Sequence, residues 1–187
     1  MHVSEPAEYA ILGLLEARPM HGYEMFQHFQ GGTLGQIVHL EMSQMYAFLK
    51  KLERLNYIVA ELEPQGSRPP RKVFHLTDAG RDYFRHWLTE PVERPRDIRI
   101  LFLLKLYFIR HVLPDELPSL IERQIAACQA FLEHLEELQA HQEQRAPVQD
   151  LTFFERVVLR SRLHQTRALI AWLQELQHDC SLVSSRP

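Results

Sequence analysis

Polar and cationic side chains recur along residues 41–55, on the side opposite the large apolar residues. They are Ser43, Gln44, Tyr46, Lys50, Lys51 and Arg54. A helix that enters the major groove of DNA needs short or hydrogen-bonding side chains at its start and cations further along. Ser43 and Gln44 have the chemistry to reach base edges, and a glutamine amide suits bidentate bonding with adenine. Tyr46 and Lys50 lie one turn apart and suit phosphate contacts. Lys51 and Arg54 suit a clamp on the DNA backbone.

Three further cations follow at residues 68–72. They are Arg68, Arg71 and Lys72, which suit a wing lying over the adjacent minor groove. Because the formal net charge of the chain is −3, a DNA-binding face requires cations to be concentrated, and these two groups concentrate them. Alternatives without a DNA-binding role stay open. The cations can be solvated surface charges, Tyr46 a partly buried core aromatic, and Gln44 a solvated surface amide.

The segment that carries the first group has the apolar period of an amphipathic helix. Met45, Phe48, Leu49, Leu52 and Leu55 recur at three- and four-residue intervals. Asn56 follows, and it tolerates the left-handed geometry at which helices commonly end. Residues 57–62 and 71–76 are rich in β-formers and flank a turn with Pro and Gly, so they predict a hairpin. Thr77 is a candidate cap for a helix over 78–89.

Two shorter helices are predicted before this segment. Residues 9–15 form a dense apolar run and residues 23–29 a short second helix, while the Gly-rich residues 31–35 predict a flexible turn. Three helices, a basic hairpin and a following helix are the layout of a winged helix-turn-helix, with residues 41–55 as its recognition helix.

The C-terminal half is predicted to be helical. A polar, Pro-rich stretch at 90–96 marks the boundary between a winged helix-turn-helix domain over 1–90 and a helical domain over 91–187. Helices are predicted over 97–112, 117–138 and 152–177. The near-heptad apolar spacing of the middle one suits packing against another helix. We expect a dimer interface here, and a monomeric helical subdomain packed on the N-terminal core is the alternative. The predicted fold class is mainly α with a small β-hairpin.

Composition argues against several classes of protein. Apolar residues make up 45% and charged residues 24% of the 187 residues, as in soluble globular proteins. Cys128 and Cys180 form no CxxC pattern, so neither a disulfide framework nor a zinc finger is expected, and a reducing cytoplasm is the default compartment. No signal peptide or membrane span is expected, because the most apolar run, 98–109, is short and contains two cations. We recognise no catalytic motif, metal-ligand cluster or cofactor loop, and do not expect an enzyme.

Four blocks of residues together carry a family resemblance. They are 9–15 (YAILGLL), 21–24 (HGYE), 43–55 (SQMYAFLKKLERL) and 73–80 (VFHLTDAG). With these blocks the sequence resembles the PadR-like family of transcriptional regulators. The helical tail, with the block 101–108 (LFLLKLYF), looks like the longer, virulence-activator-type C-terminal domain of that family.

Two positions depart from the family pattern. Asn56 stands where glycine is common, and Glu41 stands where a small polar residue often opens the recognition helix. Asparagine is tolerable at a left-handed position, so the fold is not threatened. A carboxylate beside a phosphate is unfavourable, so Glu41 is expected to face away from DNA, or Ser43 to be the true cap.

The resemblance implies partners as well as a fold. It implies homodimers held by the C-terminal helices, places the family's tyrosine, here Tyr46, at the DNA, and implies a response to small aromatic or drug-like molecules. Residues that suit such an effector pocket are Trp87, Phe102, Tyr107, Phe108 and Trp172, with plain core packing as the alternative.

These features predict a sequence-specific regulator, a repressor that binds an inverted repeat in double-stranded DNA as a homodimer and is released by a small-molecule effector. A winged-helix protein-interaction module without specific DNA binding is the second hypothesis.

Overall fold

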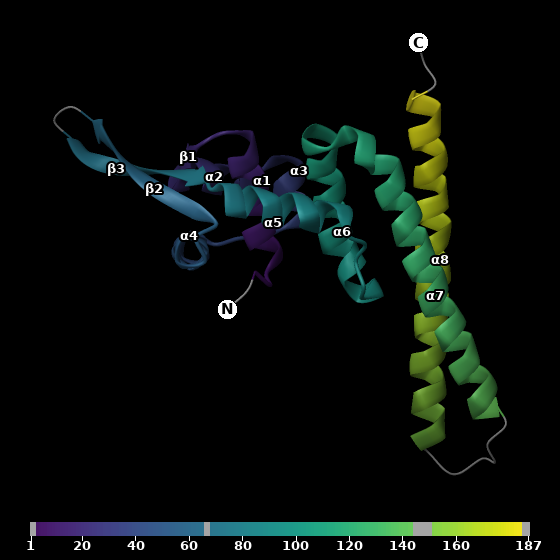
Figure 1. The fold of residues 1–187 in the computed structure, drawn as a ribbon. Coiled ribbons are helices and arrows are strands. Elements are labelled where there is room, and N and C mark those ends of the chain that lie inside the picture. Colours follow the sequence, from purple (N-terminus) through teal and green to yellow (C-terminus); the bar gives the residue numbers. More distant parts are fainter. Residues whose placement is uncertain (1–2, 66–67, 144–150, 185–187) are drawn as a thin grey trace. The chain divides into compact units, whose positions relative to one another are not determined.

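The structure is a computed structural model that describes residues 3–65, 68–143 and 151–184. The chain divides into two compact units, one made of Met1–Glu90 with Asp97–Glu116 and the other of Pro91–Arg96 with Leu117–Pro187. Figure 1 labels the helices and strands of both. The predicted fold class, mainly α with a small β-hairpin, is confirmed, and a third short strand extends the hairpin to a three-stranded sheet.

The first unit begins with helices. Within residues 3–65 these are α1 (Pro6–Ala17), α2 (Gly22–Gln30), α3 (Gly32–Ile37) and α4 (Met42–Arg54). The prediction of a flexible turn at 31–35 is wrong, because the chain winds into α3 and buries its Leu34 side chain. Glycine is costly in a helix, and the burial of Leu34 offsets part of that cost. In this part of the chain, four helices rather than three precede the hairpin.

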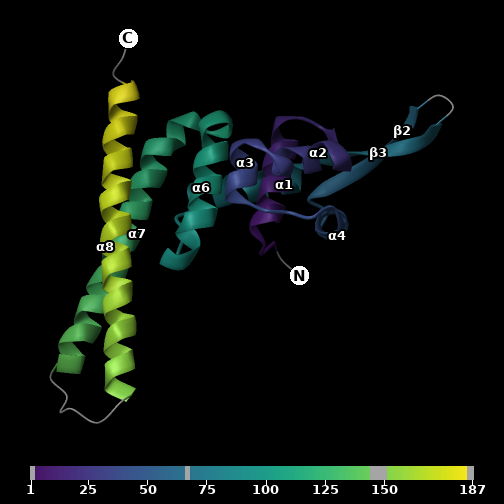
Figure 2. The same cartoon turned by 180° about the vertical axis from the view of Figure 1, so that it is seen from behind.

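A small antiparallel sheet carries the wing. β2 (Ile58–Gln65) and β3 (Arg68–Leu76) form the predicted hairpin, and β1 (Met20–His21) pairs with the other side of β3. The sequence does not predict β1, because two residues carry no alternating pattern. The hairpin extends outward from the helices of its unit, as Figure 1 and the reverse view in Figure 2 show.

Local hydrogen bonds fix the junction between α4, the hairpin and α5 (Asp78–Thr89). Asn56 has a φ of 57°, the left-handed geometry predicted for the helix end. The Thr77 hydroxyl accepts from the Gly80 amide at 3.0 Å and donates to the Asn56 carbonyl oxygen at 2.7 Å. A Cβ at Gly80 would lie 2.1 Å from the Tyr57 carbonyl oxygen, so only glycine fits there.

α6 (Pro95–Val112) packs within the first unit, although the expected domain boundary precedes it. Phe108 lies so close to α1 that a Cβ on Gly13 would be 2.5 Å from its ring. Phe108 also packs edge-on against Phe84 of α5, with 5.6 Å between ring centroids. Burial of these large rings explains why residues 97–116 cluster with residues 1–90. A single 3-10 turn, Pro114–Glu116, follows.

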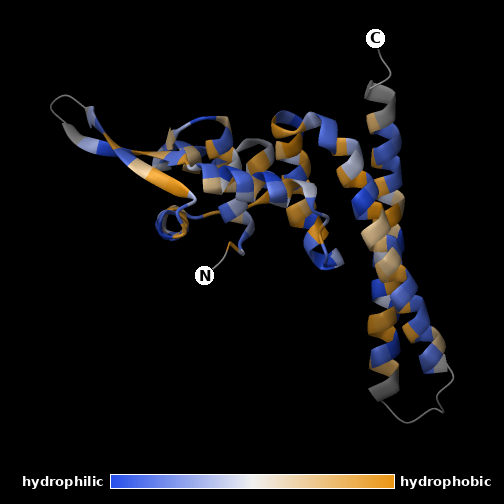
Figure 3. Ribbon diagram, viewed as in Figure 1, coloured by the Kyte–Doolittle hydropathy of each residue, from blue (hydrophilic) through white to orange (hydrophobic). Residues whose placement is uncertain are grey.

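The second unit is a pair of long helices, α7 (Leu117–Glu143) and α8 (Leu151–Ser184), which lie side by side (Figures 1 and 2). One buried cluster of this unit consists of Leu135, Leu159 and Leu163, with Phe131 and Leu132 packed against it. Figure 3 shows hydrophilic and hydrophobic segments alternating along both helices, as expected of helices with one apolar side. α8 continues past the predicted end at 177. No helix among the described residues is both long and apolar enough to cross a membrane.

Candidate nucleic-acid interface

α4 presents polar side chains outward because its other side is buried. Met45, Leu49 and Leu52 are at most 1% exposed, as the three- and four-residue period requires. On the outer side, the exposed predicted residues are Ser43, Gln44, Tyr46, Lys50 and Arg54. Tyr46 is 51% exposed, so it is a surface residue and not part of the core.

Tyr46 and Lys50 lie beside two cations of the hairpin. Together with Arg71 and Lys72 of β3 they line one hollow of about 890 Å³, whose other wall is the start of α2. Gly22 lets that helix come close, since a Cβ there would lie 3.1 Å from the Tyr46 ring. The lining also includes the carboxylates of Glu24 and Glu53. The three cations and the Tyr46 phenol are the groups in this concave surface that suit an anionic partner such as a phosphate backbone.

Lys51, predicted to clamp the DNA backbone, is held inside the protein. Its Nζ lies 2.6 Å from Oε1 of Glu8, a residue of α1 whose side chain is fully buried. The other carboxylate oxygen of Glu8 accepts the backbone N–H groups of Ser4 and Glu5 at 2.9 and 3.2 Å. The ion pair therefore ties α4 to α1 and engages the ammonium group that was predicted to contact a phosphate. A carboxylate at the start of a densely apolar helix was the sequence signal for this pair.

The other predicted cations have different surroundings. Arg54 is exposed in the last turn of α4. Nζ of Lys72 lies 4.0 Å from Oε1 of Glu53, a partly exposed pair that contributes little to stability. The backbone of Arg68 begins β3, but its side chain lies outside the described residues.

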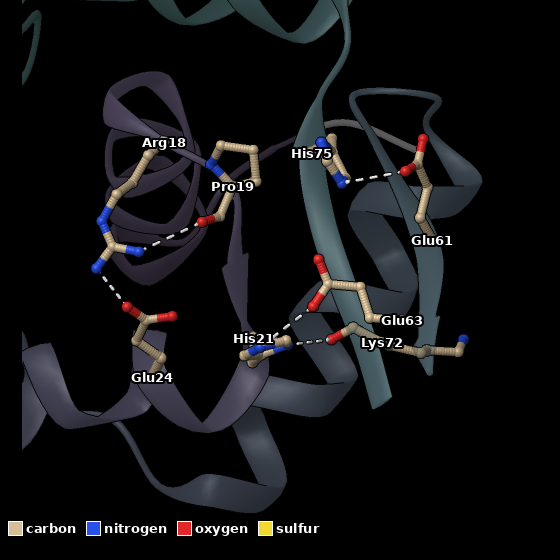
Figure 4. Close-up of polar contacts among 8 residues, drawn as sticks. All are labelled: Arg18, Pro19, His21, Glu24, Glu61, Glu63, Lys72 and His75. Atoms are coloured by element: carbon tan, nitrogen blue, oxygen red, sulfur yellow. Dashed lines mark hydrogen bonds and ion pairs between the residues drawn. The ribbon is translucent and has the colours of Figure 1, made fainter. Parts of the chain in front are cut away.

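The wing also carries two carboxylates that the sequence analysis does not assign. Glu61 and Glu63 lie on β2 at alternate positions, which places them on one face of the sheet. Oε2 of Glu61 is 3.5 Å from Nε2 of His75, and Oε2 of Glu63 is 3.9 Å from Nε2 of His21 (Figure 4). Nδ1 of His21 donates to the Lys72 carbonyl oxygen at 3.2 Å. The wing is thus a surface of mixed charge.

Glu41 is the N-cap residue of α4, so the alternative in which Ser43 is the cap is wrong. Oε1 of Gln44 accepts the Glu41 backbone N–H at 3.0 Å. The Glu41 carboxylate accepts the Gln44 backbone N–H in return, which completes a capping box. Nε2 of His39 lies 3.2 Å from the same carboxylate. A negative charge at this helix end is favoured by the helix dipole.

The residues predicted for an effector pocket do not belong to one unit. Trp87, Phe102, Tyr107 and Phe108 belong to the first, and Trp172 to the second. Phe102 and Phe108 are buried, and Tyr107 packs edge-on against Phe108 with 4.9 Å between centroids. These contacts are those of core packing, and the pocket stays a prediction. Among the described residues, no group of three or more His, Cys, Asp or Glu is placed to hold a metal ion.

Lys105 is a buried amine that the sequence analysis counts only as a charge in an apolar run. Its side chain donates to the Trp87 carbonyl oxygen, and Nζ lies 3.9 Å from the centre of the Trp87 ring. Burial lowers the pKa of Lys105 to about 7, against a smaller opposing effect of the Glu90 carboxylate. The stability of the first unit therefore depends on pH around neutrality.

Comparison with known proteins identifies the family. A family model described as the transcriptional regulator PadR-like family matches residues 11–86, and one described as virulence activator alpha C-term matches residues 98–179. The negative transcriptional regulator PadR of Bacillus subtilis is 31% identical over 173 residues, which cover 90% of this chain and 94% of that protein. This chain belongs to the PadR-like family of transcriptional regulators. A probable transcriptional regulator of Mycobacterium tuberculosis is 31% identical over 88 residues, 47% of this chain and 46% of that protein.

Solved structures of Bacillus subtilis PadR are similar over nearly the whole chain. The crystal structure in complex with operator DNA is 28% identical, with a TM-score of 0.47, and covers 95% of this chain and 99% of that one. The crystal structure in complex with p-coumaric acid is 26% identical, with a TM-score of 0.43 and the same coverage. In this PadR-like regulator, the matched residues 11–86 include α4 and both strands of the wing, and so they include the hollow described above.

Proposed function

We propose that this PadR-like regulator is a repressor that binds an inverted repeat in double-stranded DNA, sequence-specifically and as a homodimer. The observation that carries the proposal is the hollow lined by Tyr46, Lys50, Arg71 and Lys72 beside the exposed start of α4. Groups that can reach base edges, next to cations for the adjacent phosphates, are what sequence-specific binding needs. The relative in Bacillus subtilis is a negative regulator, which supports repression rather than activation.

A salt titration of DNA binding tests the phosphate contacts. Lys50→Ala and Arg71→Ala should each make the dependence of log affinity on log salt shallower by about one unit, because each removes one phosphate contact. Arg160→Ala is the matched control, since it removes an equal charge from an exposed position on α8. Two results would contradict the proposal. One is that Lys50→Ala and Arg71→Ala change the slope of log affinity against log salt no more than Arg160→Ala does. The other is that the wild type does not bind DNA at low salt.

The homodimer is proposed to form through the second unit. Exposed apolar side chains, Leu138 of α7 with Phe153, Phe154, Val157 and Val158 of α8, support this placement. Phe154 is 70% exposed, so Phe154→Glu should leave the helix pair folded while it lowers the dimer fraction in sedimentation velocity. An unchanged dimer fraction, with unchanged helix content, places the interface elsewhere.

Release by a small aromatic effector is the remaining part of the proposal. The aromatic residues around α5 and α6 support it by composition, and p-coumaric acid, which the Bacillus subtilis protein binds, is the probe. Titration of p-coumaric acid into the protein–DNA complex should lower the bound fraction. An unchanged bound fraction at millimolar acid argues against this effector class.

A protein-interaction module is the second candidate, and the carboxylates of the wing favour it. Glu61 and Glu63 are exposed on β2 and would face the phosphates of bound DNA if the wing lies over the minor groove. The salt titration separates the two candidates, because an interaction module binds duplex DNA weakly and without sequence choice.

A further inference from the structure

The first turn of α4 offers a defined set of hydrogen-bonding groups. Gln44 uses its side-chain oxygen to accept the Glu41 backbone N–H at 3.0 Å, inside the capping box. The box leaves both side chains exposed on the outer side of the recognition helix. It is these exposed groups, and not the amino-acid types alone, that determine which base atoms the turn can bind.

The capping box already engages the amide oxygen of Gln44, which accepts the Glu41 backbone N–H. Bidentate bonding with adenine needs that oxygen to accept from N6 while the amide nitrogen donates to N7. With the oxygen bound to the backbone, Gln44 retains the two hydrogens on Nε2, which are both donors. In the major groove, guanine presents two neighbouring acceptors, N7 and O6, and no donor.

Glu41 supplies the complementary group. Its carboxylate accepts hydrogen bonds only, and its side chain is 68% exposed. Cytosine presents a donor, the N4 amino group, in the major groove. The major-groove edge of a G·C pair therefore offers acceptors for Gln44 and a donor for Glu41 next to each other.

We infer that the Glu41–Gln44 capping box reads a G·C base pair, with Gln44 donating to guanine and Glu41 accepting from cytosine N4. The inference rests on the proposed function and replaces the adenine contact expected from the sequence. It also gives a role to Glu41, the residue that departs from the family pattern, and replaces the expectation that its carboxylate faces away from DNA.

Two variants separate the outward groups from the cap itself. Gln44→Glu keeps an oxygen that accepts the Glu41 N–H, so the box is preserved while the outward donor becomes an acceptor. Glu41→Ser keeps a favourable N-cap and removes the carboxylate. The wild-type full-length chain first selects its preferred duplex from a random pool. All four base pairs are then tested at each position of that duplex, with wild type and both variants.

Affinity ratios between base pairs are the readout, because the uniform loss from an added negative charge cancels in a ratio. Lys50→Ala is the control, and it should weaken binding to all duplexes without changing the ratios. The wild type should prefer G·C at one position by roughly tenfold or more. Gln44→Glu and Glu41→Ser should each reduce that ratio by several fold and leave the ratios at other positions unchanged.

Two results would overturn the inference while the proposed function stands. One is a preference for A·T at the position that Gln44→Glu alters, which means that the capping box opens to pair with adenine. The other is unchanged ratios at every position in both variants, with far-ultraviolet circular dichroism showing that both are folded. A wild-type protein that selects no sequence overturns the proposed function itself, and the inference falls with it.

Discussion

Replacement of either of two adjacent lysines on α4 by methionine should affect the stability of the protein very differently. Lys51 is paired with fully buried Glu8 at 2.6 Å, whereas Lys50 is exposed beside the hollow. Lys51→Met leaves the Glu8 carboxylate buried without its counter-charge, and breaking a buried pair in this way costs about 3–5 kcal/mol. Two backbone N–H groups still bond to Glu8, so we expect the lower end, about 3 kcal/mol. Lys50→Met should change stability by less than about 0.5 kcal/mol.

Urea unfolding followed by circular dichroism measures these differences. In a double-mutant cycle, Glu8→Gln with Lys51→Met should be less destabilised than the sum of the single variants by about 1–3 kcal/mol, because the combination leaves no unpaired charge. DNA binding, measured at a temperature where both variants are folded, should instead be affected by the Lys50 substitution. Lys50→Met should make the salt dependence shallower, and Lys51→Met should not.

Either of two results would refute this reasoning. The first is a Lys51→Met protein as stable as Lys50→Met, which would make the Glu8 pair equivalent to a solvated surface pair. The second is an equal change of salt slope in the two variants, which would place Lys51 at the phosphates.

Three further predictions concern stability. The pKa of Lys105 lies at about 7 rather than 10.5, so the unfolded chain binds the proton more tightly and stability should rise between pH 7 and 10.5, by at most about 1.4 kcal/mol per unit. Lys105→Met should flatten that rise in urea unfolding at pH 7 and 9. Gly80→Ala should destabilise by about 1–3 kcal/mol through the clash with the Tyr57 carbonyl, whereas Gly31→Ala, whose Cβ would meet nothing within 4 Å, should not. Leu163→Ala should lower the stability of the second unit by about 2–5 kcal/mol in thermal unfolding, and a smaller loss would mean that its cluster collapses around the cavity.

The sequence by itself determined the helices and helix ends that depend only on residues close to them in the chain. The period of apolar residues places α4 and its buried side, the left-handed tolerance of Asn56 ends it, and the Thr77 cap starts α5 at Asp78. Each of these signals lies within a few residues of the structure that it specifies, so one stretch of sequence suffices. The exposure of Ser43, Tyr46 and Lys50 follows from the same period.

The tertiary structure decided the contacts between distant segments. Lys50 and Lys51 are the same residue type at neighbouring positions, and only the carboxylate of Glu8, on another helix, turns one of them inward. β1 exists because β3 offers a free edge, and Arg71 and Lys72 join Tyr46 and Lys50 because the sheet brings β3 beside α4. The capping contact of Gln44, whose amide oxygen accepts the Glu41 backbone N–H, is likewise visible only in the structure. Composition and period specify which side of a helix is polar, but the partners of each polar atom depend on three-dimensional packing.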